Sequence, residues 1–241
     1  MIFLEDPNLL FLKTRKTAGT SFEISLSRHA TEGDIVTPIS AVDEILRRRV
    51  GGVFPQNWAN TPEAERAFRA AVDTFAASSE GAAAPVFMRR FKKQAVFFNH
   101  FGPDIVCPRI GEDRFARALK VTICRHPYDQ LVSQAFFRLR HGQADFSVAV
   151  DRILEKPHPN STLYLLEGKP VIDVFLRYET LDADIAALER RTGLDLLSAM
   201  PKAKAGFRKD RRPASELLTR EQKARCREIN RWEFDNLDYA P

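Results

Sequence analysis

The feature of this sequence that most restricts its fold is a short apolar run that leads directly into a basic, hydroxyl-rich turn. Residues 9–12 are all apolar, and a run of this length is typical of a strand buried on both faces of a parallel sheet. The next residues, KTRKTAGTS, supply three basic side chains, one glycine and hydroxyl groups where a helix would begin. Glycine lets the backbone approach an anion closely, and helix N-termini bind anions. The order predicts a first strand, an anion-binding turn and a helix.

The order of residues in this turn differs from that of the loop that binds nucleoside triphosphates. That P-loop has the pattern G-x-x-x-x-G-K-[ST], in which the lysine follows the second glycine. Here Lys16 and Thr17 precede Gly19, which is the only glycine of the turn. On its own, the stretch is also compatible with an ordinary basic turn between a strand and a helix. A second segment is needed to choose between these interpretations.

The second segment, residues 119–136, has the sequence LKVTICRHPYDQLVSQAF. Its first half predicts a buried strand that ends at Arg125, and Pro127 is well placed to begin a helix. Ser133 then lies about two turns into that helix. An arginine fork and a hydroxyl group bind a phosphate dianion well. The same strand argues against a kinase or a GTPase, because those enzymes place a magnesium-binding acid at the end of a neighbouring strand.

Both segments resemble motifs of sulfotransferases that use 3′-phosphoadenosine 5′-phosphosulfate (PAPS). The sequence RKTAGTS resembles the 5′-phosphosulfate loop P-K-T-G-G-T-S of the carbohydrate-modifying members, with Arg15 in place of the proline and Ala18 in place of the first glycine. The sequence RHPYDQLVS resembles the 3′-phosphate motif R-x-P-x-D-x-x-x-S at every defined position. These resemblances imply that PAPS is bound by the following residues: Lys16, Thr17, Ala18, Gly19, Thr20, Ser21, Arg125 and Ser133.

Three further elements resemble the same family more loosely. The apolar run 95–98 predicts a strand that ends at His100, and the family has a G-H-F element after such a strand, in which the histidine of some members is the catalytic base. A histidine in an aromatic segment is equally compatible with simple packing. Tyr178 falls in a segment that resembles Y-E-x-L-x-x-D, which implies a contact with adenine. Gly206 and Arg208 fall in a segment that resembles the K-x-G-R loop, which closes over PAPS.

The resemblance implies an α/β fold of the P-loop-like three-layer type, in which helices flank a central parallel sheet. The length favours one domain, so residues 1–241 are interpreted as a single sulfotransferase domain. The implied activity is the transfer of a sulfuryl group from PAPS to a hydroxyl or amine group of an acceptor, a carbohydrate or a glycolipid. In this interpretation Lys16 stabilises the departing phosphate, His100 accepts the proton of the acceptor, and no metal ion is required.

Composition indicates the cellular compartment of the protein but does not identify its binding partner. The 37 Lys+Arg against 32 Asp+Glu give a net charge of +5, which is compatible with a phosphorylated cofactor, an anionic glycan or nucleic acid. The motifs favour the first two, and no nucleic-acid partner is expected. Three cysteines without C-x-x-C spacing favour a reducing compartment. No run of about 18 apolar residues occurs, so a soluble cytoplasmic protein without a transmembrane segment is expected.

Two other functions are compatible with the sequence. A non-catalytic module could bind a bisphosphorylated nucleotide or an anionic polymer with the same basic turn, and it would not need His100 close to Lys16. A P-loop kinase could also bind a nucleotide, although the lysine precedes the glycine and the second strand ends in Arg125 rather than in an acid. The position of His100 relative to the basic turn distinguishes the first alternative from an enzyme.

Overall fold

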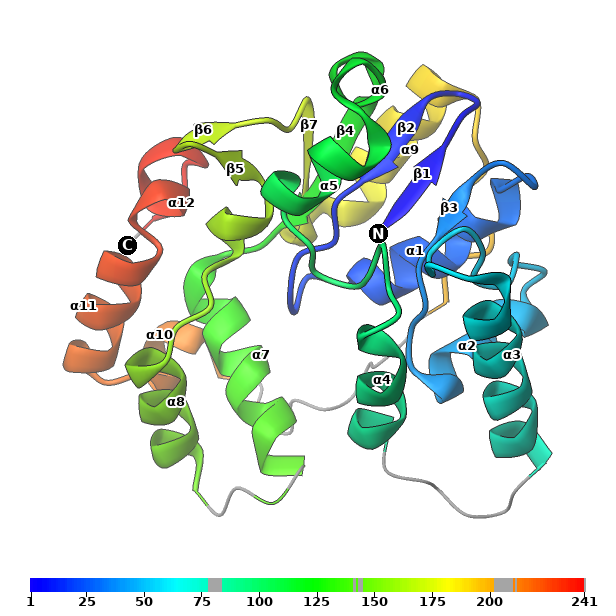
Figure 1. The fold of residues 1–241 in the computed structure, drawn as a ribbon. Coiled ribbons are helices and arrows are strands. Elements are labelled where there is room, and N and C mark those ends of the chain that lie inside the picture. The colour runs from blue at the N-terminus through cyan, green and yellow to red at the C-terminus, as the bar shows by residue number, and fades with distance from the viewer. Residues whose placement is uncertain (78–83, 141, 143–144, 202–209, 211, 241) are drawn as a thin grey trace.

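A five-stranded sheet forms the centre of the protein (Figure 1). The computed structural model describes residues 1–77, 84–140, 142, 145–201, 210 and 212–240. In spatial order the strands are β3 (Ile35–Val36), β1 (Ile2–Leu4), β2 (Leu9–Phe11), β4 (Leu119–Cys124) and β7 (Val174–Arg177). The strands β2, β4 and β7 are parallel, whereas β1 is antiparallel to both of its neighbours. The sheet is therefore mixed, and the expectation of a parallel sheet is wrong for β1, which runs opposite to β2, β3, β4 and β7.

The antiparallel pairing of β1 and β2 has a simple cause. The two strands are joined by the short turn at residues 5–8, and a parallel pair needs a crossover of a dozen or more residues. In contrast, most of the chain between β2 and β4 lies outside the sheet, which leaves room for a parallel connection. In the parallel part, Phe11 pairs with Val121 and Cys124 pairs with Arg177, so the ends of β2 and β4 open at the same edge.

Helices cover both faces of this sheet (Figure 1). On one face, α1 and α9 pack against side chains of β2 and β4, and on the other face α5 and α6 pack against side chains of β1, β2 and β3. The helices in the described residues are α1 (Gly19–Leu26), α2 (Ala41–Arg49), α3 (Pro62–Ala77), α4 (Ala84–Lys92), α5 (Pro103–Ile110), α6 (Glu112–Arg117), α7 (Pro127–Arg140), α8 (Phe146–Glu155), α9 (Leu181–Thr192), α10 (Ala214–Leu217), α11 (Arg220–Ile229) and α12 (Arg231–Asn236). None of these helices is both long and apolar enough to cross a membrane.

Elements with strong local signals form close to where the sequence predicts them. The strand of the first motif is β2, and α7 begins at Pro127, as the second motif predicts. Near the C-terminal end, the helices α11 and α12 are divided at Asn230. There the Asn230 side-chain amide donates to the Cys226 carbonyl at 2.8 Å, which is a local bond that competes with helix continuation.

The strand predicted to end at His100 does not form. In place of sheet pairing, the backbone N–H groups of Val96 and Phe97 both donate to the Trp58 carbonyl, at 2.8 and 2.9 Å. The apolar residues of this segment fill two hydrophobic cores and do not form a strand. Phe97 packs in the core beneath α5, while Phe98 packs with Trp58 in the core between α2, α3 and α4. His100 therefore follows a buried turn between two cores and not a strand.

A buried ion pair connects the end of β2 to the first helix. The Lys13 ammonium pairs with the Glu23 carboxylate of α1, and the Met1 amino group bonds to the same carboxylate. All three groups are buried. Burial alone would raise the pKa of Glu23, but the two positive charges outweigh it and lower the pKa to about 2. The carboxylate is therefore ionised at neutral pH and holds β1, the exit of β2 and α1 together.

We expect Lys13→Met to destabilise the fold strongly. Removing one partner of a buried ion pair leaves an undercompensated charge and typically costs about 3–5 kcal/mol in unfolding free energy. Urea denaturation at pH 7 measures this loss. Arg66→Met is the control, because it removes an exposed pair with Glu63 and should change stability by less than about 1 kcal/mol. Equal stability of the two variants would show that the Glu23 cluster does not hold the sheet and helix together.

Candidate active site

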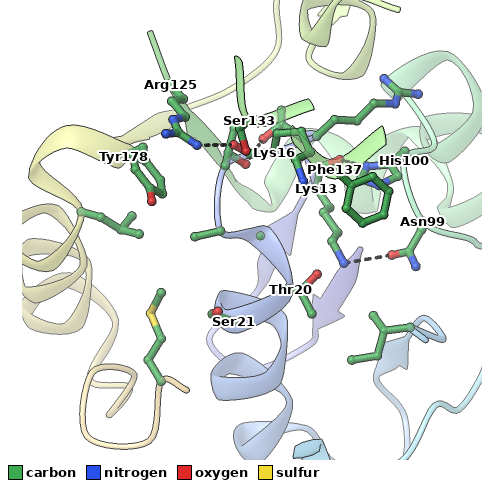
Figure 2. Close-up of a pocket in the computed structure, with 18 of the residues that line it drawn as sticks. Lys13, Lys16, Thr20, Ser21, Asn99, His100, Arg125, Ser133, Phe137 and Tyr178 are labelled. Atoms are coloured by element: carbon green, nitrogen blue, oxygen red, sulfur yellow. Dashed lines mark hydrogen bonds between the residues drawn. The ribbon is translucent and has the colours of Figure 1, made fainter. Parts of the chain in front are cut away.

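A cavity of about 1000 Å³ lies where the loops that follow β2 and β4 meet the starts of α1 and α9 and the inner face of α7 (Figure 2). Parallel sheets commonly bind ligands at this edge, outside the carboxyl ends of their strands. The predicted site residues that line it are Lys16, Thr17, Ala18, Gly19, Thr20, Ser21, His100, Arg125, Ser133 and Tyr178. The other two predicted residues, Gly206 and Arg208, lie outside the described residues.

Hydrogen bonds inside the loop after β2 fix its shape. The Thr14 hydroxyl donates to the carbonyl of Ile123 in β4, so it can only accept the bond from the Thr17 hydroxyl, at 2.8 Å. Both hydroxyl groups are buried and used within the protein. Thr17 therefore has its backbone N–H, and not its hydroxyl proton, to offer a ligand. This differs from the role of the hydroxyl in an ATP-binding P-loop, where it coordinates magnesium.

The loop ends in two tightly packed residues at the start of α1. Ala18 has a left-handed backbone with φ of 65°, and it is the residue that precedes the helix. At Gly19, a Cβ atom would lie 2.9 Å from the Cγ of Lys13, so the lysine stem needs a glycine beside it. Because Lys13 is held by Glu23, the stem cannot move away cheaply. Gly19 thus lets the lysine pass under the start of α1.

One side of the cavity is formed by Arg125 and Tyr178. Figure 2 shows both side chains beside the start of α1, with Ser133 between Arg125 and Lys16. The Arg125 Nη1 donates to the Lys16 carbonyl at 3.1 Å, and its guanidinium carbon lies 4.0 Å from the centre of the Tyr178 ring. The Lys16 ammonium lies 4.3 Å from the centre of the Phe137 ring of α7. Cation–ring contacts of this kind orient both basic groups.

The opposite side of the cavity carries His100 and Asn99 (Figure 2). His100 has a left-handed backbone with φ of 60°, and its Nδ1 lies 3.0 Å from the Lys13 carbonyl oxygen. A carbonyl can only accept a hydrogen bond, so Nδ1 carries the proton and Nε2 keeps its lone pair. Burial, with the nearby charges of Lys13 and Arg15, lowers the pKa of His100 to about 3. The ring is therefore a neutral base at physiological pH.

Sequence reasoning missed one residue that shapes the site. Asn160, in the short helical turn η2 (Asn160–Leu163), accepts from the Arg15 N–H at 2.9 Å and donates to the Arg15 carbonyl at 3.1 Å. In the sequence Asn160 stands in a proline-rich interruption, which indicates a turn but not its partner. Phe137, which contacts Lys16, was likewise visible only as an apolar residue of a predicted helix.

Comparison with known proteins identifies no family for this chain. No protein-family model matches the chain, and neither curated proteins nor solved structures gave a match. In the described part of the chain, no group of three or more His, Cys, Asp and Glu side chains is arranged to hold a metal ion. The function must therefore be inferred from the site itself.

We expect Ala18→Gly to stabilise the protein. A left-handed backbone costs an alanine about 1–2 kcal/mol, which exceeds the roughly 0.4–1 kcal/mol that the extra freedom of glycine costs in the unfolded chain. The net gain in unfolding free energy should be up to about 1 kcal/mol, measured by urea denaturation. Ala187→Gly, on the exposed face of α9, is the control and should lose about 0.5–1 kcal/mol. A loss in both variants would mean that Ala18 is not strained.

Proposed function

We propose that this protein is a PAPS-dependent sulfotransferase with a P-loop-like fold, which transfers a sulfuryl group to a hydroxyl or amine group of a carbohydrate or glycolipid. One observation carries the proposal. The loop that contains Lys16, the pair Arg125 and Ser133, and the neutral ring of His100 all line a single cavity. Two separate anion-binding groups suit a nucleotide with phosphates at both ends of its ribose, and a base beside them suits a transfer reaction.

The donor groups of the cavity fit such a nucleotide. The start of α1, with Gly19, Thr20 and Ser21, offers backbone N–H groups to a 5′-phosphosulfate. Arg125 and Ser133, which line the same cavity, would bind the 3′-phosphate, and the half-exposed ring of Tyr178 would contact the adenine. When bound, PAPS supplies the sulfuryl group. The chain supplies the position and charge that the transfer needs.

Two side chains would act on the reacting groups. The Lys16 ammonium would stabilise the negative charge that develops on the departing phosphate, since a fixed charge is most effective where charge appears in the transition state. His100 Nε2 would accept the proton of the acceptor group, because its lone pair is available and its Nδ1 is fixed by the Lys13 carbonyl. The sulfuryl group then passes from the phosphate oxygen to the acceptor oxygen or nitrogen, and the proton passes to His100.

The position of His100 supports an enzyme over a non-catalytic binding module. A module needs only the basic loop, and a histidine elsewhere in the fold would favour it. Here His100 and Lys16 line the same cavity, and the histidine is bonded to the backbone of the loop at Lys13. A kinase has less support, because the lysine precedes the glycine and the Thr17 hydroxyl is bonded within the loop.

The nucleotide proposal is tested by thermal unfolding without added metal. The product 3′-phosphoadenosine 5′-phosphate should raise the melting temperature, and at 100 times its dissociation constant it should stabilise by about 2.7 kcal/mol. AMP, which lacks the 3′-phosphate, should stabilise less. Arg125→Gln should remove this preference, while the control Arg117→Gln, an exposed arginine outside the cavity, should keep it. Equal stabilisation of the wild type by AMP would refute the 3′-phosphate site.

The proposed base is tested with His100→Asn. Asparagine tolerates a left-handed backbone and keeps a donor for the Lys13 carbonyl, but it has no basic nitrogen. Turnover should fall about 100- to 10,000-fold, while affinity for the product nucleotide stays unchanged.

The pH profile gives an independent check on His100. Its pKa of about 3 lies below the ordinary value of 6.5, so the ring stays neutral and the rate should show no inflection near pH 6.5 from this group. The neutral ring contributes stability above pH 6.5, and this contribution should be lost as the pH falls from 6.5 toward 3, in the wild type but not in His100→Asn. Wild-type turnover in the variant would make His100 a packing residue.

A further inference from the structure

Arg15 stands where the sulfotransferase loop pattern has proline, and its side chain also lines the cavity. The guanidinium is half-buried, and within the described residues its Nη1 is buried without a hydrogen-bond partner. Burial lowers the pKa of this guanidinium from its ordinary value, yet arginine stays charged in proteins. A buried donor without a partner is costly, and because Arg15 also lines the cavity, a ligand that binds the exposed part of the guanidinium would offset this cost.

The backbone of Arg15 is fixed more firmly than a surface loop requires. Asn160 is buried and bonds both the N–H and the carbonyl of Arg15. The turn that carries Asn160 is itself held from α12, because Glu233 accepts bonds from the Ser161 N–H at 3.1 Å and the Tyr164 hydroxyl at 2.7 Å. Since the backbone is already ordered, a ligand that binds the guanidinium would pay a smaller entropic cost.

The surroundings of Arg15 indicate which half of the cavity it serves. Arg15 stands two residues after Lys13, whose carbonyl oxygen lies 3.0 Å from His100 Nδ1, and its charge is one of those that lower the pKa of His100, so Arg15 belongs to the side of the proposed base. Among the described lining residues the one carboxylate is Asp182, which follows Tyr178 and Leu181 in the chain. The His100 side therefore presents the charged Arg15 and the neutral groups of Asn99 and His100 toward the cavity, while the Lys13 ammonium is paired with Glu23.

We propose that Arg15 binds an oxyanion of the acceptor, next to the hydroxyl group that His100 deprotonates, so that the acceptor is an acidic sugar. This inference rests on the proposed function, because it assigns the His100 side of the cavity to the acceptor. A planar guanidinium forms two parallel hydrogen bonds to a carboxylate or to a phosphate or sulfate ester, and proline has no group that does so. Arg15 would thus select a charged acceptor over its neutral analogue.

The test measures binding of a matched pair of probes by calorimetry, with and without 3′-phosphoadenosine 5′-phosphate. The pair is 4-nitrophenyl β-D-glucuronide and 4-nitrophenyl β-D-glucoside, which differ in one carboxylate. The wild type should bind the glucuronide at least 10-fold more tightly. Arg15→Gln should reduce glucuronide affinity to that of the glucoside and leave affinity for the nucleotide unchanged. The 6-phosphate of the glucoside, as a third probe, distinguishes a phosphate-bearing acceptor from a carboxylate-bearing one.

The control variant is Arg28→Gln. Arg28 is also half-buried, and its Nη1 also lacks a hydrogen bond within the described residues, but it is not among the residues that line the cavity. It should bind all probes as the wild type does. Equal wild-type affinity for charged and neutral probes, no binding of any probe, or weaker nucleotide binding in Arg15→Gln overturns the proposal.

The binding test separates this inference from the proposed function. Suppose that the protein prefers the charged probe, that this preference depends on Arg15, and that no sulfuryl group is transferred from PAPS. This result would contradict the proposed function and support an acidic ligand. Transfer from PAPS to neutral acceptors alone would support the function and overturn the role of Arg15. A higher KM for PAPS in Arg15→Gln, with acceptor preference unchanged, would also overturn it, because the guanidinium would then serve the nucleotide.

Discussion

The buried carboxylate of Glu23 is the interaction on which the rest of the site depends. It brings together the Lys13 ammonium at the exit of β2, the Met1 amino group beside β1, and the helix α1 from which it projects. A charge so deeply buried is tolerated only with partners in good geometry. Because the stem of Lys13 also passes against Gly19, the ion pair fixes the distance between the strand exit and the helix start, and with it the shape of the loop between them.

The loop in turn orients the side chains that surround it. The carbonyl groups of Lys13, Arg15 and Lys16 accept hydrogen bonds from His100, Asn160 and Arg125, which come from three distant segments. A carbonyl oxygen carries partial negative charge and repels an anion. Carbonyl groups that are already bonded to the surrounding wall interfere less with an anion at the start of α1, where N–H groups point outward. One short loop therefore positions His100, Arg125 and Arg15, which are the proposed base and the two guanidinium groups proposed to bind anions.

Arg125 and Arg15 both line the cavity, and two basic groups suit the proposed reaction between two charged partners better than a non-catalytic binding module. Arg125 and Tyr178 contact each other on one side, while His100 and Asn99 lie on the other (Figure 2). The uncharged state of His100 follows from the same arrangement, because neighbouring positive charges and burial both oppose its protonation. The charges that would bind the substrates thus also keep the ring of His100 neutral.

The sequence by itself determined the elements whose signals are local. The strand β2, the strand β4 with Arg125 directly after it, and the start of α7 at Pro127 were predictable, because strand burial and the preference for proline in the first turn of a helix depend on adjacent residues. Only the tertiary structure decided what lies far apart in the chain. Phe97 and Phe98 are as apolar as a strand requires, yet they fill two separate cores, and the contact of Asn160 with Arg15 spans 145 residues. Such contacts depend on how the whole chain packs, which no local pattern records.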